Sequence, residues 1–121
     1  MLRRMLLIQL AALCAPALAA EPQVIEVKLE SYAVKPDTIT VKVGQPVTLK
    51  VRNEATFIPH NLVIKAPDAG IDVKLDLAAG KSGEVSFTPT KAGRYEMVCD
   101  KAPPIGKSHK EKGMHGILVV E

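Results

Sequence analysis

The sequence predicts an all-β protein, a Greek-key β-sandwich of about seven or eight strands. Apolar and polar residues alternate over Thr38–Val43 and again over Val47–Asn53, the pattern of half-buried strands. Gly and Pro residues separate such segments at short intervals, as expected of turns between strands. No segment has a convincing amphipathic helical pattern. Together these observations favour a sandwich with one aliphatic core.

The strands follow in order along the chain. We expect them over Val24–Leu29, Thr38–Val43, Val47–Asn53, Asn61–Lys65, Glu84–Thr88, Arg94–Val98 and His115–Val120. Ser31–Pro36 is interpreted as a turn or a broken strand, and Val85 and Phe87 are predicted to face inward. Ala66–Gly80 contains Pro67, Gly70 and Gly80, so we expect a looser connection in which Ile71–Ala79 forms a helical turn or two.

The first twenty residues differ in composition from the rest. A short basic start with Arg3 and Arg4 precedes an apolar segment over Met5–Leu13, and small residues end at an A-x-A site over Ala17–Ala19. This pattern predicts a secretory signal peptide over residues 1–20, followed by a single domain over 21–121. The apolar segment is too short to span a membrane. We therefore expect export to the periplasm without a membrane anchor, by the general or the twin-arginine route.

Charge excludes one class of partner. Without Arg3 and Arg4, 14 basic residues remain against 13 acidic residues, a net charge near +1. Nucleic-acid binding needs a concentrated basic surface, which this balance does not supply. We expect a monomer whose partners are proteins.

The cysteine count is informative. Cys14 falls in the predicted signal peptide, so Cys99 is the one thiol of the mature chain. In an oxidising compartment a lone thiol is buried and inert, pairs between molecules, reacts, or binds a metal. His109 and Met114 follow Cys99 closely and favour the metal.

Thiolate, imidazole and thioether groups are the ligands that soft and borderline metals select, and two His, one Cys and a distant axial Met describe a blue-copper site. The predicted ligands of one copper ion are His60, Cys99, His109 and Met114. His115 competes with His109 for the second imidazole position. Because neighbouring residues of a strand face opposite ways, a Met114 that faces the metal directs His115 away from it.

Four segments carry a family resemblance. They are Pro59–Val63 (P-H-N-L-V), Tyr95-x-x-x-Cys99, His109-x-x-x-Gly113-Met114-x-Gly116, and Ile117–Val120. In this order they resemble the cupredoxins, the small type 1 blue-copper proteins of the plastocyanin and pseudoazurin kind. The resemblance covers the whole mature chain. It implies one Cu(II)/Cu(I) site, an exposed edge of His109 as the electron exit, and an Asn61 that ties two ligand loops together.

One feature departs from small cupredoxins. Nine residues, Asp100–Ser108, separate Cys99 from His109, where only a few are usual. A similar loop with adjacent prolines occurs in the type 1 copper domain of copper nitrite reductases. Nitrite reduction needs a second copper site with its own histidines, and only His115 remains for one. We therefore expect a protein that is not an enzyme.

Three functions remain open. The first is a one-electron carrier that meets a redox partner protein. The second is a copper-handling protein, for resistance or for delivery to a copper-accepting protein, with the same ligands. The third is a metal-free binding module. Near His109, residues 102–105 could form an apolar docking patch or merely a rigid loop. Four lysines in the same region could form a basic docking rim or merely keep the loop solvated: Lys101, Lys107, Lys110 and Lys112.

Overall fold

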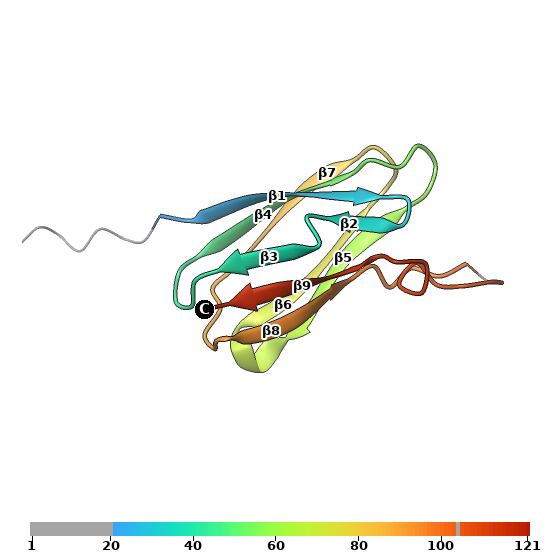
Figure 1. Ribbon diagram of the computed structural model, residues 1–121. Coiled ribbons are helices and arrows are strands. Elements are labelled where there is room, and N and C mark those ends of the chain that lie inside the picture. The colour runs from blue at the N-terminus through green and yellow to red at the C-terminus, as the bar shows by residue number, and fades with distance from the viewer. Residues whose placement is uncertain (1–20, 104) are drawn as a thin grey trace, which may run out of the picture.

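The computed structural model describes residues 21–103 and 105–121. The predicted signal peptide and Pro104 lie outside the described residues. Nine strands and one 3-10 turn form two packed sheets (Figure 1). The strands are β1 (Gln23–Glu30), β2 (Ala33–Lys35), β3 (Thr38–Val41), β4 (Val47–Asn53), β5 (His60–Ala66), β6 (Ile71–Leu77), β7 (Ser82–Phe87), β8 (Gly93–Val98) and β9 (His115–Val120).

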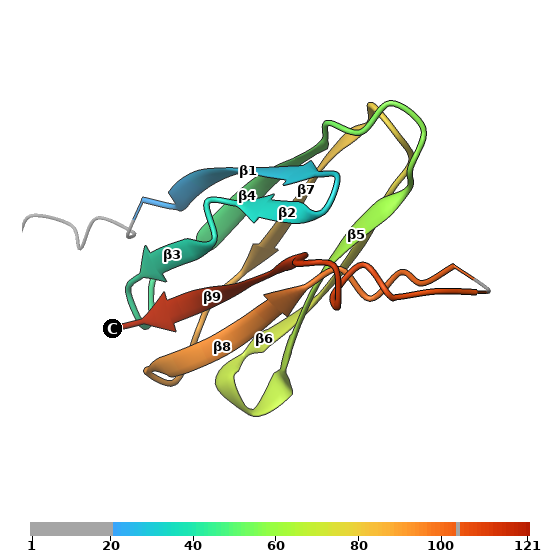
Figure 2. The ribbon, with the colours of Figure 1, turned by 45° about the vertical axis from the view of Figure 1, so that its right-hand side comes forward.

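The two sheets are a four-stranded sheet of order β2-β1-β4-β7 and a five-stranded sheet of order β3-β9-β8-β5-β6. Strands that neighbour each other in a sheet are often distant in sequence, because the chain crosses from one sheet to the other (Figure 2). Thus β1 pairs in parallel with β4, and β3 pairs in parallel with β9. The predicted all-β sandwich is confirmed.

Most strand predictions match the structure closely. The predicted bounds of β4 and β9 are those observed, and β3 ends two residues earlier than expected. The broken strand expected over Ser31–Pro36 contains the three residues of β2. Val85 and Phe87 are half-buried and pack against the core, as predicted.

The prediction for Ala66–Gly80 was wrong. Ile71–Leu77 is the regular strand β6, in which Ile71, Val73 and Leu77 are buried and the residues between them are mostly exposed. The helical turn lies earlier, as a 3-10 turn over Pro67–Ala69 that ends at Gly70 with a left-handed φ of 73°. Proline starts such a turn and glycine ends it, so Pro67 and Gly70 mark the turn that precedes β6 and do not exclude a strand after it.

The core between the sheets is aliphatic. Val27, Leu29, Leu49 and Val51 from the four-stranded sheet meet side chains from the five-stranded sheet, all of them buried. The latter include Leu62, Ile64, Met97 and Leu118. In the part of the chain described here, no helix has the length and apolar character that a membrane crossing needs.

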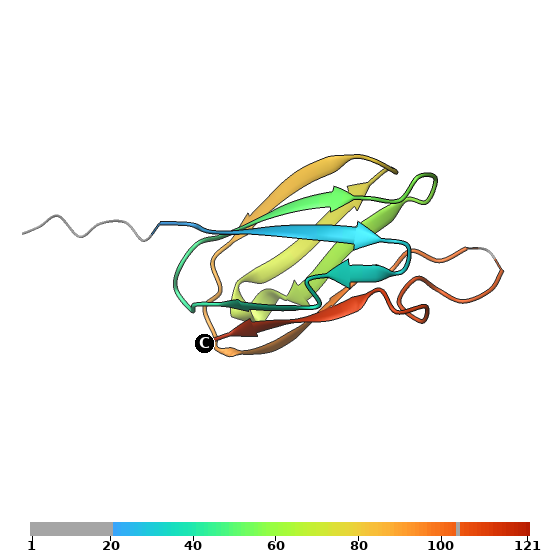
Figure 3. The same ribbon diagram turned by 45° about the horizontal axis from the view of Figure 1, so that its top comes forward.

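Three strand ends meet at one end of this sandwich. In the order β9-β8-β5, the antiparallel pairing brings the start of β5, the end of β8 and the start of β9 to the same edge. Figures 1 and 3 show that the β1–β2 turn and the long loop after β8 lie at this end as well. The sequence-predicted ligands all fall on these segments.

Candidate metal centre

The rigid sheet places the predicted ligands. His60 is the first residue of β5, Cys99 follows the last residue of β8, and Met114 precedes the first residue of β9. The ladder pairs Val98 with His115, and the Cys99 amide donates a 3.1 Å hydrogen bond to the Met114 carbonyl. Adjacent strands of one sheet therefore hold three of the four predicted ligands, and a loop supplies His109.

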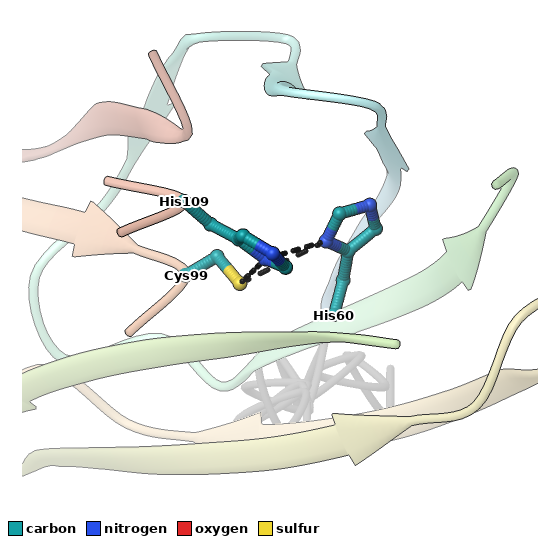
Figure 4. Close-up of side chains that lie close together, drawn as sticks. All are labelled: His60, Cys99 and His109. Carbon is teal, nitrogen blue, oxygen red and sulfur yellow. Dashed lines mark hydrogen bonds between the residues drawn. The ribbon is translucent and has the colours of Figure 1, made fainter. Parts of the chain in front are cut away.

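The structure brings His60, Cys99 and His109 together in a buried triangle (Figure 4). The two Nδ1 atoms of His60 and His109 lie 3.2 Å apart. The Cys99 Sγ atom lies 3.4 Å from Nδ1 of His109 and 3.9 Å from Nδ1 of His60. His60 and Cys99 have no exposed surface, and His109 is only 7% exposed.

The triangle has the size of a metal site. The point equidistant from three corners with sides of 3.2, 3.4 and 3.9 Å lies about 2 Å from each corner, close to the bond lengths of a first-row metal ion to imidazole and thiolate. Among the described residues, Nε2 of His60 is the one buried side-chain N or O atom without a hydrogen-bond partner. Nδ1 of the same ring is the atom that belongs to the triangle, so His60 makes its side-chain polar contacts through the site alone. The donor set fits copper.

Burial sets the protonation states of the triangle. Burial, and then the nearby charge of His109, lower the pKa of His60 from 6.5 to about 4. Burial, followed by the charges of Lys112 and Lys101, lowers the pKa of His109 as well. Burial raises the pKa of the Cys99 thiol, although the backbone amides of Asn61 and Lys101 oppose that rise. At neutral pH both imidazoles are thus neutral and able to bind a metal, whereas the thiol must lose a proton to do so.

Asn61 connects β5 to the segment after β8. Its side-chain carbonyl accepts a 3.0 Å hydrogen bond from the Asp100 amide, and its Nδ2 donates to the Asp100 carboxylate at 2.6 Å and to Asp76 at 3.4 Å. The Asn61 backbone amide also donates to Cys99 Sγ at 3.4 Å. The resemblance predicted that Asn61 ties two ligand loops together, and these contacts confirm it. Such bonds restrain the ligands in one arrangement.

The long Cys-to-His spacing is accommodated by a protruding loop. The His109 amide donates a 2.8 Å hydrogen bond to the Lys101 carbonyl, which closes the loop at its base. The described residues between them, 102–103 and 105–108, project from the end of the sandwich (Figures 1 and 3). A turn over residues 109–113 then leads back to β9, with the Met114 amide donating to the His109 carbonyl at 3.0 Å. His109 reaches the site because the extra residues bulge outward beyond this closure.

The environments of Met114 and His115 differ as predicted. Met114 has no exposed surface, whereas His115 is exposed. His115 is therefore not part of the triangle, and the alternation argument that favoured His109 holds. Met97, which the sequence placed in the core, is also fully buried.

The family follows from comparison with known domains. The model of the cupredoxin-like domain family matches residues 3–120. The chain belongs to this family. No curated protein sequence matches the chain.

Solved cupredoxin structures of similar shape include two auracyanins. A dithionite-reduced auracyanin from Roseiflexus castenholzii is 25% identical, with a TM-score of 0.67, and the match covers 84% of this chain and 98% of that one. Auracyanin A from Chloroflexus aurantiacus, described as a "blue" copper protein, is 26% identical, with a TM-score of 0.65. The match covers 84% of this chain and 100% of that one. The periplasmic domain of cytochrome oxidase subunit II from Bradyrhizobium japonicum is 18% identical over 82% of this chain and 83% of that one, with a TM-score of 0.61, and shares the fold.

Two of the four lysines near the cupredoxin site are paired with carboxylates. Lys101 forms a 2.9 Å salt bridge with Asp76, which lowers the pKa of Asp76 and raises that of Lys101. Lys110 forms a 2.8 Å salt bridge with Glu96. This local pairing favours the interpretation of a solvated loop over a basic docking rim.

Tyr32 is a site neighbour that the sequence reasoning missed. Its ring lies edge-to-face on both imidazoles, with centroids 5.5 Å from His109 and 6.4 Å from His60. The sequence shows only a tyrosine in a turn, and no spacing links it to residues nearly thirty and eighty positions away. Its scarcity, as one of two tyrosines in the chain, was the single available signal.

Proposed function

We propose that this cupredoxin binds one copper ion through His60, Cys99, His109 and Met114 and acts as a one-electron carrier. The observation that supports the proposal most is the buried triangle of two imidazole nitrogens and one thiol sulfur, which has the size and donor set of a copper site. The similarity to auracyanins, one of which is described as a "blue" copper protein, supports the same function.

Each predicted ligand has a distinct role in the proposed copper site. Cys99 gives up its proton and offers a thiolate, and the two neutral imidazoles complete a plane with it. Met114, which is fully buried, would supply the fourth ligand. Copper supplies the Cu(II)/Cu(I) couple. The strand ends and Asn61 keep the ligands in place, so that a change of oxidation state needs little rearrangement. His109, the least buried of the three corners, is the proposed electron exit.

A second candidate function is copper handling. Cys99, His109 and Met114 all lie within residues 99–114, a single connection between β8 and β9. An opening of this connection at the Lys101–His109 closure would release His109, while the strand ends keep Cys99 and Met114 in place. This arrangement suits delivery to a copper-accepting protein as well as permanent binding.

The setting of the protein is part of the proposal. We infer export to the periplasm from the composition of residues 1–20, and we propose that the mature protein works as a monomer that meets a redox partner protein. It carries out no bond chemistry of its own. Phe57 and Ile105, 89% and 90% accessible, are the most exposed of the large apolar side chains among the described residues and would be available to such a partner.

The visible spectrum tests the proposal. Mature protein is loaded with one equivalent of Cu(II), and the spectrum is recorded before and after a mild reductant and again after reoxidation. An intense band that bleaches and returns, and that is absent in Cys99→Ser, supports a reversible thiolate–copper site. A protein that gives no such band and binds Cu(I) alone would contradict the electron carrier and favour copper handling.

A further inference from the structure

Tyr32 has an unusual backbone conformation. It lies in the turn between β1 and β2 with a φ of +92°, and it is the one non-glycine residue with positive φ among the described residues. For a side chain with a Cβ atom this conformation is strained. Such strain persists where the surrounding structure enforces it, and it is concentrated at functional sites. This backbone conformation places the Tyr32 ring beside the imidazoles of His60 and His109.

The Tyr32 ring lies next to the buried triangle of His60, Cys99 and His109. The Cys99 sulfur has no exposed surface and lies within 3.9 Å of Nδ1 of His60 and of His109. The Tyr32 ring covers both imidazoles, at interplanar angles of 80° to His60 and 65° to His109. These edge-to-face arrangements are the favourable ones for aromatic rings. One ring thus restrains both imidazoles at once.

Residues 112 and 113, in the turn after His109, contact Tyr32. The Lys112 ammonium lies 4.4 Å from the centroid of the Tyr32 ring, and Nζ also lies 3.4 Å from the phenol oxygen. A Cβ atom added to Gly113 would lie 3.1 Å from the Tyr32 carbonyl oxygen, so the turn and the loop are in close contact. The β1–β2 turn and residues 109–113 therefore contact each other beside the site.

We propose that Tyr32 is a positioning residue that closes the metal centre: its ring keeps the imidazoles of His60 and His109 facing Cys99 and shields the thiol from solvent. The inference rests on the proposed function in one respect, that the closed site retains copper. The shielding itself is a property of the metal-free protein. The two can therefore be tested separately.

The first measurement is the rate at which Cys99 of the metal-free protein reacts with 5,5′-dithiobis(2-nitrobenzoate). Tyr32→Gly suits the positive φ and removes the ring, so the turn keeps its shape while the cover is lost. Loss of two aromatic contacts should speed labelling about tenfold. Tyr32→Phe keeps the ring and the cation–π contact, and its rate should stay within about twofold of wild type.

Tyr95→Ala is the matched control, because Tyr95 is the other tyrosine of the chain and lies four residues before Cys99 along β8. It should label like wild type. Equal rates for Tyr32→Gly and wild type would overturn the proposal, as would a Tyr95→Ala rate as fast as that of Tyr32→Gly. If Tyr32→Gly is unfolded by circular dichroism, Tyr32→Asn takes its place under the same criteria, because asparagine tolerates a positive φ.

The second measurement uses the Cu(II)-loaded protein. Tyr32→Gly should release copper to a chelator about tenfold faster than wild type and shift the visible band. Tyr32→Phe should have the release rate and the band position of wild type. Wild type without a thiolate–copper band would contradict the proposed function while the labelling rates still decide the role of Tyr32. A band in Tyr32→Gly with wild-type position and release rate would contradict positioning of the ligands.

Discussion

Acid should destabilise the metal-free protein through His60. Burial and the neighbouring His109 lower the pKa of His60 from 6.5 to about 4 in the folded state. Above pH 6.5 the ring is neutral in both the folded and the unfolded chain, and it has no effect on stability. Between pH 6.5 and 4 the unfolded chain takes up a proton that the folded protein rejects, so the free energy of unfolding falls. Below about pH 4 both states are charged, and this slope ends.

The magnitude follows from the size of the pKa shift. A difference of one pKa unit corresponds to about 1.4 kcal/mol, so the shift of His60 removes about 3 kcal/mol of stability between pH 6.5 and 4. The lowered pKa of His109 acts in the same direction. This loss is a large share of the stability of a small domain, which is about 5–15 kcal/mol.

Urea denaturation of the metal-free protein at several pH values measures this effect. The range from pH 7 to 4.5 avoids the titration of Asp76, whose salt bridge with Lys101 stabilises the fold above its ordinary pKa and is lost only in stronger acid. His60→Leu should flatten the profile, and the exposed control His115→Gln should not. A wild-type profile that is already flat, or a His60→Leu profile as steep as wild type, would refute the reasoning.

Three further predictions concern the surroundings of the site. Asn61→Ala removes the hydrogen bonds to the Asp100 amide and carboxylate, and should lower the free energy of unfolding by about 2–4 kcal/mol in urea denaturation. An unchanged midpoint would contradict the inference that Asn61 ties the two ligand segments together. His109→Ala should lose the visible band of the Cu(II) protein, whereas His115→Ala should keep it, and the opposite order would overturn the ligand set. Gly116→Ala would place a Cβ atom 2.5 Å from the backbone oxygen of Asp37, and should lower the thermal midpoint by the equivalent of about 1–3 kcal/mol. A stability equal to wild type would mean that the backbone at Asp37 moves away without cost.

The sequence predicted the fold well where local patterns carry the information. Val47–Asn53 alternates strictly and is a strand with the predicted bounds, because one face of its sheet is buried and the other is solvated. Ile71–Leu77 alternates too, but the flanking Pro67, Gly70 and Gly80 suggested a looser connection. The pairing of β6 with β5 decides that segment, and no local pattern states which strand lies beside which.

The candidate ligands could be named from residue types and order, but the site could not be built from them. A lone thiol with His and Met residues nearby is enough to nominate Cys99, His109 and Met114, since few other side chains bind soft metals. That His60 joins them depends on β5 pairing next to β8, and that His109 reaches them depends on the closure of the loop at Lys101.

The sequence by itself thus determined the sandwich, the donor set and the choice of His109 over His115, because periodicity and donor chemistry are properties of each residue and its near neighbours. The tertiary structure alone decided the pKa values of the imidazoles and the place of Tyr32 over them. Burial and ring contacts arise between segments that are distant in the chain. Tyr32 meets His109 only because the β1–β2 turn and the loop after β8 close over the same end of the fold.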